Sequence, residues 1–354
     1  MNATETTTIG STQVTVSRLG LGTNPLGGMF EAVPEDEAIA TVADALHAGL
    51  RLFDTAPVYG YGNAERAVGI ALAGAARESV TVTTKVGRLL RPHEASGERD
   101  TSVLFEGHPL YRGTPDLEPR WDFSYDGAMR SLEESLVRIG MDRVDAVYVH
   151  DPDDQIQEAA EGACKALAKL KDEGVIGAIG VGCNSTRALV AMANRAPLDC
   201  VLVAGRYSLM DQEATDELLP LCVRDGISVV AGGVYNSGLL CHPEPRQLID
   251  KTDKSASAIP TWRGSATFNY TPASRERIEQ AQVLADACHE FGVPLMAAAI
   301  QFPLRHPAVA SVLMGPRNRV ELRQNLEMFE FPIPDEMWDE LRRRNLIGAI
   351  EGSR

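Results

Sequence analysis

Two residues that can hold or transfer a proton stand five positions apart in residues 53–66, FDTAPVYGYGNAER. Asp54 follows an apolar run that is typical of a buried strand, and Tyr59 comes after a proline in a glycine-rich loop. Glu65 and Arg66 then begin a segment with helical character. In α/β proteins the loops that follow the carboxyl ends of parallel strands form the ligand site. We therefore expect this stretch to bring an acid and a phenol to such a site.

Two more titratable side chains follow the next two predicted strands, Lys85 in TTKVGR and His150 in VYVHDPDD. Adjacent strands place their carboxyl ends side by side, so all four side chains should meet. Together they could transfer a proton to or from a carbonyl oxygen. A nearby Lys⁺ favours tyrosinate and lowers the pKa of a phenol from about 10, a carboxylate orients that lysine, and a histidine hydrogen-bonds the same oxygen. None of the four carries electrons, so a bound cofactor must supply the hydride.

Each of these residues, taken alone, could have a structural explanation instead of a functional one: a residue in a turn, a packed residue or a solvated residue. Their occurrence at successive strand ends on one face favours a functional interpretation, because packing alone would not require it.

The elements that position these residues alternate regularly along the chain. We predict strands at residues 18–22, 49–53, 80–84, 144–149, 176–181, 199–203, 227–231 and 309–313. The predicted helices lie at 34–49, 63–73, 125–139, 155–172, 186–194, 213–224, within 272–305 and at 319–328. Strands separated by helices pair in parallel, and eight such units fit a closed (β/α)₈ TIM barrel, which usually takes about 250 residues. We expect one barrel domain over residues 1–354.

The remaining segments also have predicted places. Residues 6–16 read as an N-terminal β-hairpin over one end of the fold, and 335–345 as a helix packed outside the barrel. Residues 88–122 and 236–271 are rich in proline, glycine and charge, so we expect two inserted substrate loops over the active face. An open doubly wound sheet is the structural alternative, but residues 19–28, LGLGTNPLGG, lack its GxGxxG spacing.

The composition is that of an acidic globular protein. Thirty-four basic and forty-nine acidic residues give a net charge of −15, which argues against nucleic acid and anionic membranes as partners. No apolar run approaches the roughly 20 residues of a membrane span, and the start MNATETTT lacks signal-peptide features, so we expect a cytoplasmic protein. The six cysteines form no CxxC pair and suggest neither a zinc site nor a disulfide framework.

Several stretches resemble the aldo-keto reductases over essentially the whole chain: DTAPVYGYGNAER, TKVG, the VH pair ending at His150, and LMGPRNRVELRQNL from Leu313. The family's catalytic tetrad falls in register with Asp54, Tyr59, Lys85 and His150. Four further runs look like the aldose 1-dehydrogenase branch, which is similar to an aldo-keto type of pyridoxal 4-dehydrogenase. These runs are HDPDD from His150, VAGRYSLMDQ from Val203, GGVYNSGLL from Gly232 and ATFNYTPAS from Ala266.

The resemblance implies a nicotinamide cofactor extended over the barrel mouth. Asn184 would meet its carboxamide, although the family's usual Ser-Asn pair is replaced here by Gly182, Cys183 and Asn184. Residues 235–240 would wrap the pyrophosphate, and 315–317 with part of the next helix would hold the adenosine end. The implied cofactor-binding residues are Gly22, Thr23, Asp54, Asn184, Tyr235, Asn236, Ser237, Gly238, Leu239, Leu240, Gly315, Pro316, Arg317, Glu321, Gln324 and Asn325.

The choice between NAD and NADP depends on Glu321. A carboxylate there would repel a 2′-phosphate and could bind a ribose hydroxyl, which predicts NAD. NADP is the alternative, because Arg317 and Arg319 could instead bind the phosphate, with Glu321 pointing to solvent.

The implied reaction is oxidation of the anomeric hydroxyl of an aldose, such as L-fucose, D-arabinose or L-galactose, to the lactone, with Tyr59 as the acid/base. Trp121 and Trp262, one in each insertion, could stack on the sugar or anchor their loops. Pyridoxal oxidation and general aldehyde reduction are alternatives within the superfamily. A metal-dependent hydrolase is a rival from another class, because acidic residues cluster around His150, but we expect no metal since no other histidine follows a strand. A non-catalytic cofactor-binding subunit is a further rival, which the intact tetrad disfavours.

Overall fold

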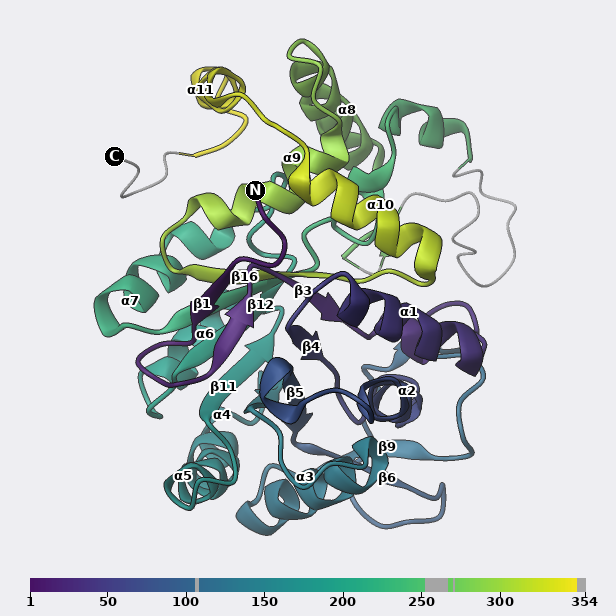
Figure 1. Cartoon of the computed structure of the whole chain (residues 1–354), viewed down its shortest axis with the longest axis vertical. Coiled ribbons are helices and arrows are strands. Elements are labelled where there is room, and N and C mark those ends of the chain that lie inside the picture. The colour runs from purple at the N-terminus through teal and green to yellow at the C-terminus, as the bar shows by residue number, and fades with distance from the viewer. Residues whose placement is uncertain (106–107, 252–266, 270, 349–354) are drawn as a thin grey trace.

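The computed structural model describes residues 1–105, 108–251, 267–269 and 271–348. Eight parallel strands close a barrel in the order β10-β11-β12-β13-β16-β3-β4-β5, which confirms the predicted (β/α)₈ fold (Figure 1). The barrel strands are β3 (Leu19–Gly22), β4 (Leu52–Asp54), β5 (Thr81–Val86), β10 (Ala146–His150), β11 (Ala178–Cys183), β12 (Cys200–Ala204), β13 (Ser228–Gly232) and β16 (Val309–Met314).

The connections between these strands are helical, as parallel pairing requires. The helices are α1 (Glu35–His47), α2 (Asn63–Leu72), α3 (Tyr125–Ile139), α4 (Ile156–Glu158), α5 (Cys164–Asp172), α6 (Thr186–Ala193), α7 (Leu218–Asp225), α8 (Arg275–His289), α9 (Leu295–Gln301), α10 (Arg319–Glu330) and α11 (Asp335–Arg343). Helix α11 packs against α8 outside the barrel, as predicted (Figure 1). No helix among the described residues is long and apolar enough to cross a bilayer.

Two predicted helices are interrupted. Between α4 and α5 the chain widens into a π-helical turn at Ala159–Ala163. A Cβ at Gly162 would collide with the backbone of Phe123, so this turn packs closely against the chain before α3. The helix predicted at 213–224 is a 3₁₀ turn, Glu213–Thr215, followed by α7. The π-helical turn thus comes from local packing that the hydrophobic pattern does not record.

The N-terminal hairpin closes the amino-terminal end of the barrel. Strands β1 (Thr6–Thr8) and β2 (Thr15–Ser17) pair antiparallel, as predicted. Ile9, Val14 and Val16 are buried in one cluster with side chains of the barrel strands, and the backbone N–H of Gly10 donates to Ser228 Oγ at 2.8 Å. The opposite, carboxyl end of the barrel is thus the one that can receive a ligand.

The first insertion contains more regular structure than the loop we predicted. Strands β6 (Arg88–Arg91) and β9 (Glu118–Trp121) pair antiparallel, and β7 (Leu104–Phe105) pairs with β8 (His108–Pro109). Partners separated by about 26 residues, one of them carrying a proline, give no local hairpin signal.

The described part of the second insertion contains two short 3₁₀ helices, η5 (Leu239–Cys241) and η6 (Pro245–Lys251). It also contains a two-stranded pair, β14 (Thr267–Phe268) and β15 (Thr271–Pro272). Residues 252–266, and with them Trp262, lie outside the described residues.

Candidate active site

Asp54 and Lys85 form a buried ion pair at the carboxyl ends of neighbouring strands. Parallel register places Asp54 of β4 beside Thr83 of β5, and Lys85 Nζ lies 2.7 Å from Asp54 Oδ2. Thr83 Oγ1 donates to the other carboxylate oxygen at 2.8 Å, and Lys85 Nζ also donates to the Thr55 carbonyl at 2.9 Å. A buried pair requires such additional hydrogen bonds to offset desolvation. These hydrogen bonds fix the orientation of the Lys85 side chain.

Tyr59 lies over this lysine because two glycines bring its loop close to the chain after β3. Lys85 Nζ is 4.8 Å from the centroid of the Tyr59 ring. A Cβ at Gly27 would come within 2.5 Å of the Tyr59 carbonyl carbon, and one at Gly60, which has a φ of 62°, would collide with the Gly27 carbonyl. Only two glycines permit this approach. Gly27 and Gly60 together thus fix the position of the Tyr59 backbone, and with it the region that the phenol can reach.

His150 is the last residue of β10 and completes the predicted constellation. Its ring meets that of Tyr59 edge-on, with centroids 5.9 Å apart and an interplanar angle of 86°. Burial, together with the charges of Arg88 and Lys85, holds the pKa of His150 well below its usual 6.5. The imidazole is therefore neutral near pH 7.

The hydrogen-bond environment of His150 assigns its tautomer. Among the described residues no group hydrogen-bonds the buried Nδ1, whereas Nε2 faces a carboxylate, with Asp151 Oδ2 at 3.6 Å, just beyond hydrogen-bond range. A buried N–H without an acceptor costs about 1–3 kcal/mol, so the proton belongs on Nε2. His150 is thus a neutral hydrogen-bond donor beside the Tyr59 phenol.

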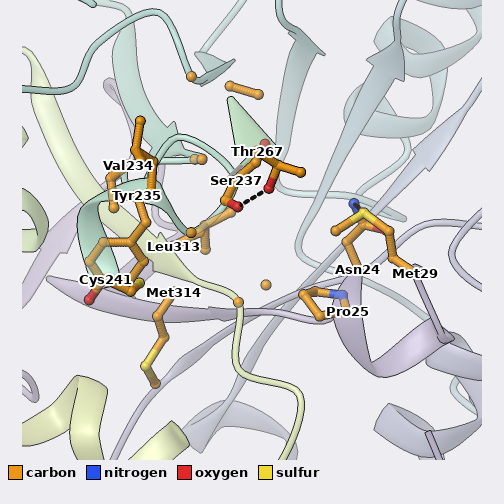
Figure 2. Close-up of a pocket in the computed structure, with 18 of the residues that line it drawn as sticks. Asn24, Pro25, Met29, Val234, Tyr235, Ser237, Cys241, Thr267, Leu313 and Met314 are labelled. Carbon is orange, nitrogen blue, oxygen red and sulfur yellow. Dashed lines mark hydrogen bonds between the residues drawn. The ribbon is translucent and has the colours of Figure 1, made fainter. Parts of the chain in front are cut away.

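A cavity of about 490 Å³ begins at Asp54 and Tyr59, a volume within the range of small-molecule and cofactor sites. Figure 2 shows it between Asn24, Pro25 and Met29 on one side and Tyr235 and Cys241 on the other. The predicted cofactor-binding residues that line it are Gly22, Asp54, Asn184, Tyr235, Ser237, Gly238, Leu239, Gly315, Arg317, Glu321, Gln324 and Asn325.

Four predicted cofactor residues, Thr23, Asn236, Leu240 and Pro316, are not among those that line the cavity. Thr23 and Asn236 are buried and support the lining instead. Thr23 Oγ1 donates to the Asp54 carbonyl at 2.9 Å, and Asn236 Oδ1 accepts from Ser208 Oγ at 2.7 Å. For these two residues, a role in direct contact with the cofactor is not favoured.

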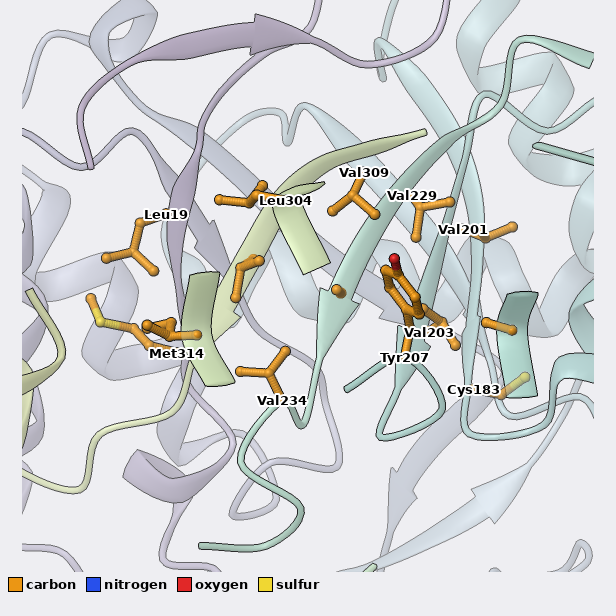
Figure 3. Packing of buried hydrophobic residues seen from close by; sticks show 14 of the residues in the cluster. Leu19, Cys183, Val201, Val203, Tyr207, Val229, Val234, Leu304, Val309 and Met314 are labelled. Atoms are coloured by element: carbon orange, nitrogen blue, oxygen red, sulfur yellow. The ribbon is translucent and has the colours of Figure 1, made fainter. Parts of the chain in front are cut away.

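The sequence missed many lining residues. They are Asn24, Pro25, Met29, Leu202, Ala204, Gly205, Arg206, Gly232, Gly233, Val234, Cys241, His242, Pro243, Leu248, Thr267, Asn269, Met296, Leu313 and Met314. Several lie at or just after the carboxyl ends of β12, β13 and β16, so the strand-end rule that brought Asp54, Lys85 and His150 together would have found them too. Val234 and Met314 belong as well to the hydrophobic core around the barrel, as Figure 3 shows, which hides their role in a hydrophobic pattern. Arg206 binds the predicted carboxamide residue, because its Nε donates to the Asn184 carbonyl at 2.9 Å.

Ion pairs and hydrogen bonds order the part of the cavity next to α10. Glu321 accepts the backbone N–H of Arg317 at 2.8 Å and its Nε–H at 2.9 Å, so this carboxylate is engaged and does not simply point to solvent. Arg319 pairs with Glu37 at 3.0 Å, away from the cavity lining. Tyr235 Oη donates to Asn325 Oδ1 at 2.8 Å, and burial raises the pKa of Tyr235 well above 10, which keeps it a donor.

Trp121 is engaged by its own loop. The Arg88 guanidinium lies 4.0 Å from its ring centroid, and Phe123 stacks on it with centroids 5.4 Å apart. This packing favours the anchoring interpretation of Trp121 over a sugar platform. Among the residues that the structure describes, no three His, Cys, Asp or Glu side chains are grouped as a metal site would need.

Comparison with known proteins decides the family. The profile of the Aldo/keto reductase family matches residues 18–345. The chain belongs to this family. It is 38% identical to the pyridoxal 4-dehydrogenase of Microbacterium luteolum, over 98% of this chain and 99% of that protein. It is likewise 38% identical to the D-threo-aldose 1-dehydrogenase of a Pseudomonas species, over 94% and 95%.

Solved structures agree with this membership. The glycerol dehydrogenase of Gluconobacter oxydans superposes with a TM-score of 0.68 at 25% identity, covering 99% of both chains. As an aldo-keto reductase the protein is an oxidoreductase that works with a nicotinamide cofactor. The cavity suits such a group, because the amides of Asn184, Gln324 and Asn325 and the Ser237 hydroxyl offer the donors and acceptors that its polar parts need.

Proposed function

We propose that the protein is an NAD-dependent dehydrogenase that oxidises the anomeric hydroxyl of an aldose, or the equivalent hydroxyl of another cyclic hemiacetal, to the lactone. Two equally similar relatives are named for D-threo-aldoses and for pyridoxal. An aldose and pyridoxal share one feature: each has a hydroxyl that can close on its own aldehyde carbon. Oxidation of the resulting hemiacetal gives a lactone in both cases. This shared chemistry makes pyridoxal the second candidate substrate.

The observation that carries the proposal is the pairing of a neutral His150 with a Tyr59 that lies over the Asp54–Lys85 ion pair. The bound nicotinamide ring supplies the acceptor for the hydride that leaves the substrate carbon. Tyr59 removes the hydroxyl proton as a tyrosinate, which the Lys85 ammonium stabilises until the proton arrives and the neutral phenol forms. Asp54 fixes Lys85. His150 donates its Nε2–H to the reacting oxygen and holds it beside Tyr59. The reverse sequence reduces an aldehyde.

Different cavity residues would bind different parts of the cofactor. In this proposal Asn184, which lines the same cavity as Tyr59, would bind the carboxamide. The loop at residues 235–239 follows the diphosphate, and Glu321, Gln324 and Asn325 hold the adenosine end. Arg317 lines the cavity and already binds the Glu321 carboxylate, so a 2′-phosphate would have to compete for it. This competition supports NAD over NADP.

The direct test is an absorbance screen at 340 nm with NAD and with NADP. The panel contains L-fucose, D-arabinose, L-galactose and pyridoxal, and mass spectrometry identifies the product. We expect the highest kcat/KM for a hemiacetal with NAD, and a lactone as product. Turnover should also survive a chelator, because the reaction uses no metal. Reduction of simple aldehydes without oxidation of any hemiacetal would instead favour a general aldehyde reductase.

A further inference from the structure

Arg88 is a buried cation that connects the first insertion to the catalytic histidine. Its residue is 3% exposed. Its Nε lies 2.5 Å from Asp100 Oδ2 within the insertion, and its Nη2 lies 2.9 Å from Asp151 Oδ2. Its Nη1 donates to the carbonyl of His150 at 3.4 Å. Burial lowers the pKa of Arg88, but the two carboxylates outweigh burial and raise that pKa above its usual value. Arg88 thus stays charged.

Asp151 occupies a constrained position immediately after His150. Its backbone is left-handed, with a φ of 48°, and its N–H donates to the Gly182 carbonyl at 2.9 Å. This conformation is uncommon outside glycine, and aspartate is one of the few residues that tolerate it. The backbone of β11 and the side chain of Arg88 therefore both hold Asp151 in place.

One oxygen of Asp151 lies between two donors. Oδ2 is 2.9 Å from Arg88 Nη2 but 3.6 Å from His150 Nε2. The contact with Arg88 is a charge-assisted hydrogen bond, whereas the contact with His150 is too long for a hydrogen bond. The carboxylate that could take the Nε2 proton of His150 is thus bound by Arg88 instead.

We propose that Arg88 is a positioning residue for His150: it holds the Asp151 carboxylate out of hydrogen-bond range, which leaves Nε2–H of His150 available for the reacting oxygen of the substrate. This inference rests on the proposed function, in which His150 is that donor. Asp100 fixes Arg88 from its other side, since the opposite oxygen of Asp100 accepts the backbone N–H of Ser102 at 2.8 Å. The insertion therefore contributes to catalysis through Arg88.

The charges around His150 determine the effect of removing Arg88. Lys85 and Arg88 are the cations near it, Asp151 is the adjacent carboxylate, Asp54 is paired with Lys85, and Tyr59 meets its ring edge. Without Arg88 the Asp151 carboxylate would be free to accept the Nε2 proton. It would also favour the imidazolium form of His150. Both effects divert the donor from the substrate.

A double-mutant cycle tests the proposal with the best substrate of the screen. The variants are Arg88→Gln, Asp151→Asn and the double variant. We expect Arg88→Gln to lower kcat about tenfold or more, because a diverted oxyanion donor is costly, while KM for the cofactor stays unchanged. In the double variant no carboxylate competes for His150, so kcat should recover to within about threefold of Asp151→Asn. A double variant as slow as Arg88→Gln would overturn the proposal, because loss of a mere scaffold is not rescued at Asp151.

The titration of His150 gives a readout independent of turnover. Two-dimensional NMR, with the His150 signal assigned by its loss in His150→Asn, should show a higher His150 pKa in Arg88→Gln than in the wild type. The double variant should reverse that change, and an unchanged titration would overturn the proposal. The matched control is Arg99→Gln, which breaks the 2.7 Å pair with Glu118 in the same insertion and should leave kcat and the titration unchanged.

Two provisions keep the result decisive. If circular dichroism shows that Arg88→Gln is unfolded, Arg88→Lys replaces it in the same cycle, because lysine keeps the charge but cannot span both carboxylates. If the wild-type enzyme oxidises no hemiacetal, the proposed function has failed. The cycle and the titration then use whichever aldehyde it reduces, so the role of Arg88 is still judged separately.

Discussion

Glu321 and Arg317 form an ion pair on the wall of the cavity: the carboxylate accepts both the backbone N–H and the guanidinium of the arginine. The charge and hydrogen bonds of each residue are thereby already engaged by the other. Neither the repulsion of a phosphate by Glu321 nor its attraction by Arg317 acts alone. The cofactor preference should depend on what the pair presents together.

We predict that Glu321→Gln shifts the preference toward NADP. The change removes a carboxylate and frees Arg317 for a 2′-phosphate, which should raise the ratio of kcat/KM for NADP to that for NAD by about tenfold, or about 1.4 kcal/mol. Glu37→Gln is the matched control, because it breaks the pair with Arg319, which does not line the cavity, and should change the ratio less than twofold. A native preference for NADP that Glu321→Gln leaves unchanged would mean that the arginines control the site.

Tyr59→Phe should lower kcat by roughly 10² or more, the usual contribution of a general acid or base, and leave cofactor affinity intact. Steady-state kinetics and a fluorescence titration with the cofactor measure the two effects. Tyr61→Phe is the control, since Tyr61 is in the same loop but does not line the cavity. Near-normal turnover in Tyr59→Phe would show that another group transfers the proton.

Gly27→Ala should displace Tyr59. The new methyl group would lie 2.5 Å from the Tyr59 carbonyl carbon, and overpacking of this kind typically costs about 1–3 kcal/mol. We expect a lower melting temperature and a lower kcat. Gly74→Ala is the control, because a Cβ there meets no atom within 4 Å. If Gly27→Ala retained full kcat, this glycine contact would not be what places the phenol.

The proximity of Asp54, Tyr59, Lys85 and His150 was predictable because it depends on a rule about strand ends and not on atomic detail. Asp54, Lys85 and His150 each directly follow a predicted strand, and a parallel barrel brings such strand ends together. The Arg88 network was not predictable in this way. Arg88 binds Asp100 twelve residues away and Asp151 sixty-three residues away, and no periodic pattern relates residues at those separations.

In the cofactor site, too, the sequence indicated individual residues but not their contacts. Motifs indicated Glu321 and Arg317, but only the fold shows that they bind each other. Trp121 could be placed in its insertion, but its partners Arg88 and Phe123 depend on how that insertion pairs its strands.

Burying a neutral His150 should cost the protein stability at acidic pH. The pKa of His150 is held well below 6.5 in the folded protein, whereas a histidine in the unfolded chain titrates near 6.5. Between these two values the unfolded state binds more protons, so the free energy of unfolding falls as the pH drops below about 6.5. His150→Asn removes this contribution. Urea unfolding at pH 7 and pH 5 should therefore show a smaller acid-induced loss in the variant, by up to about 1.4 kcal/mol per pH unit within that window.

The matched control for this titration is His289→Gln, a change at an exposed residue at the end of α8. It should lose stability between pH 7 and pH 5 as the wild type does, because removing an exposed imidazole leaves the buried one in place. Activity provides an independent check on the same group. Because His150 stays neutral well below pH 6.5, kcat/KM should show no protonation of His150 between pH 8 and pH 6. Equal acid sensitivity of the wild type and His150→Asn would contradict the buried, neutral histidine on which the proposed mechanism depends.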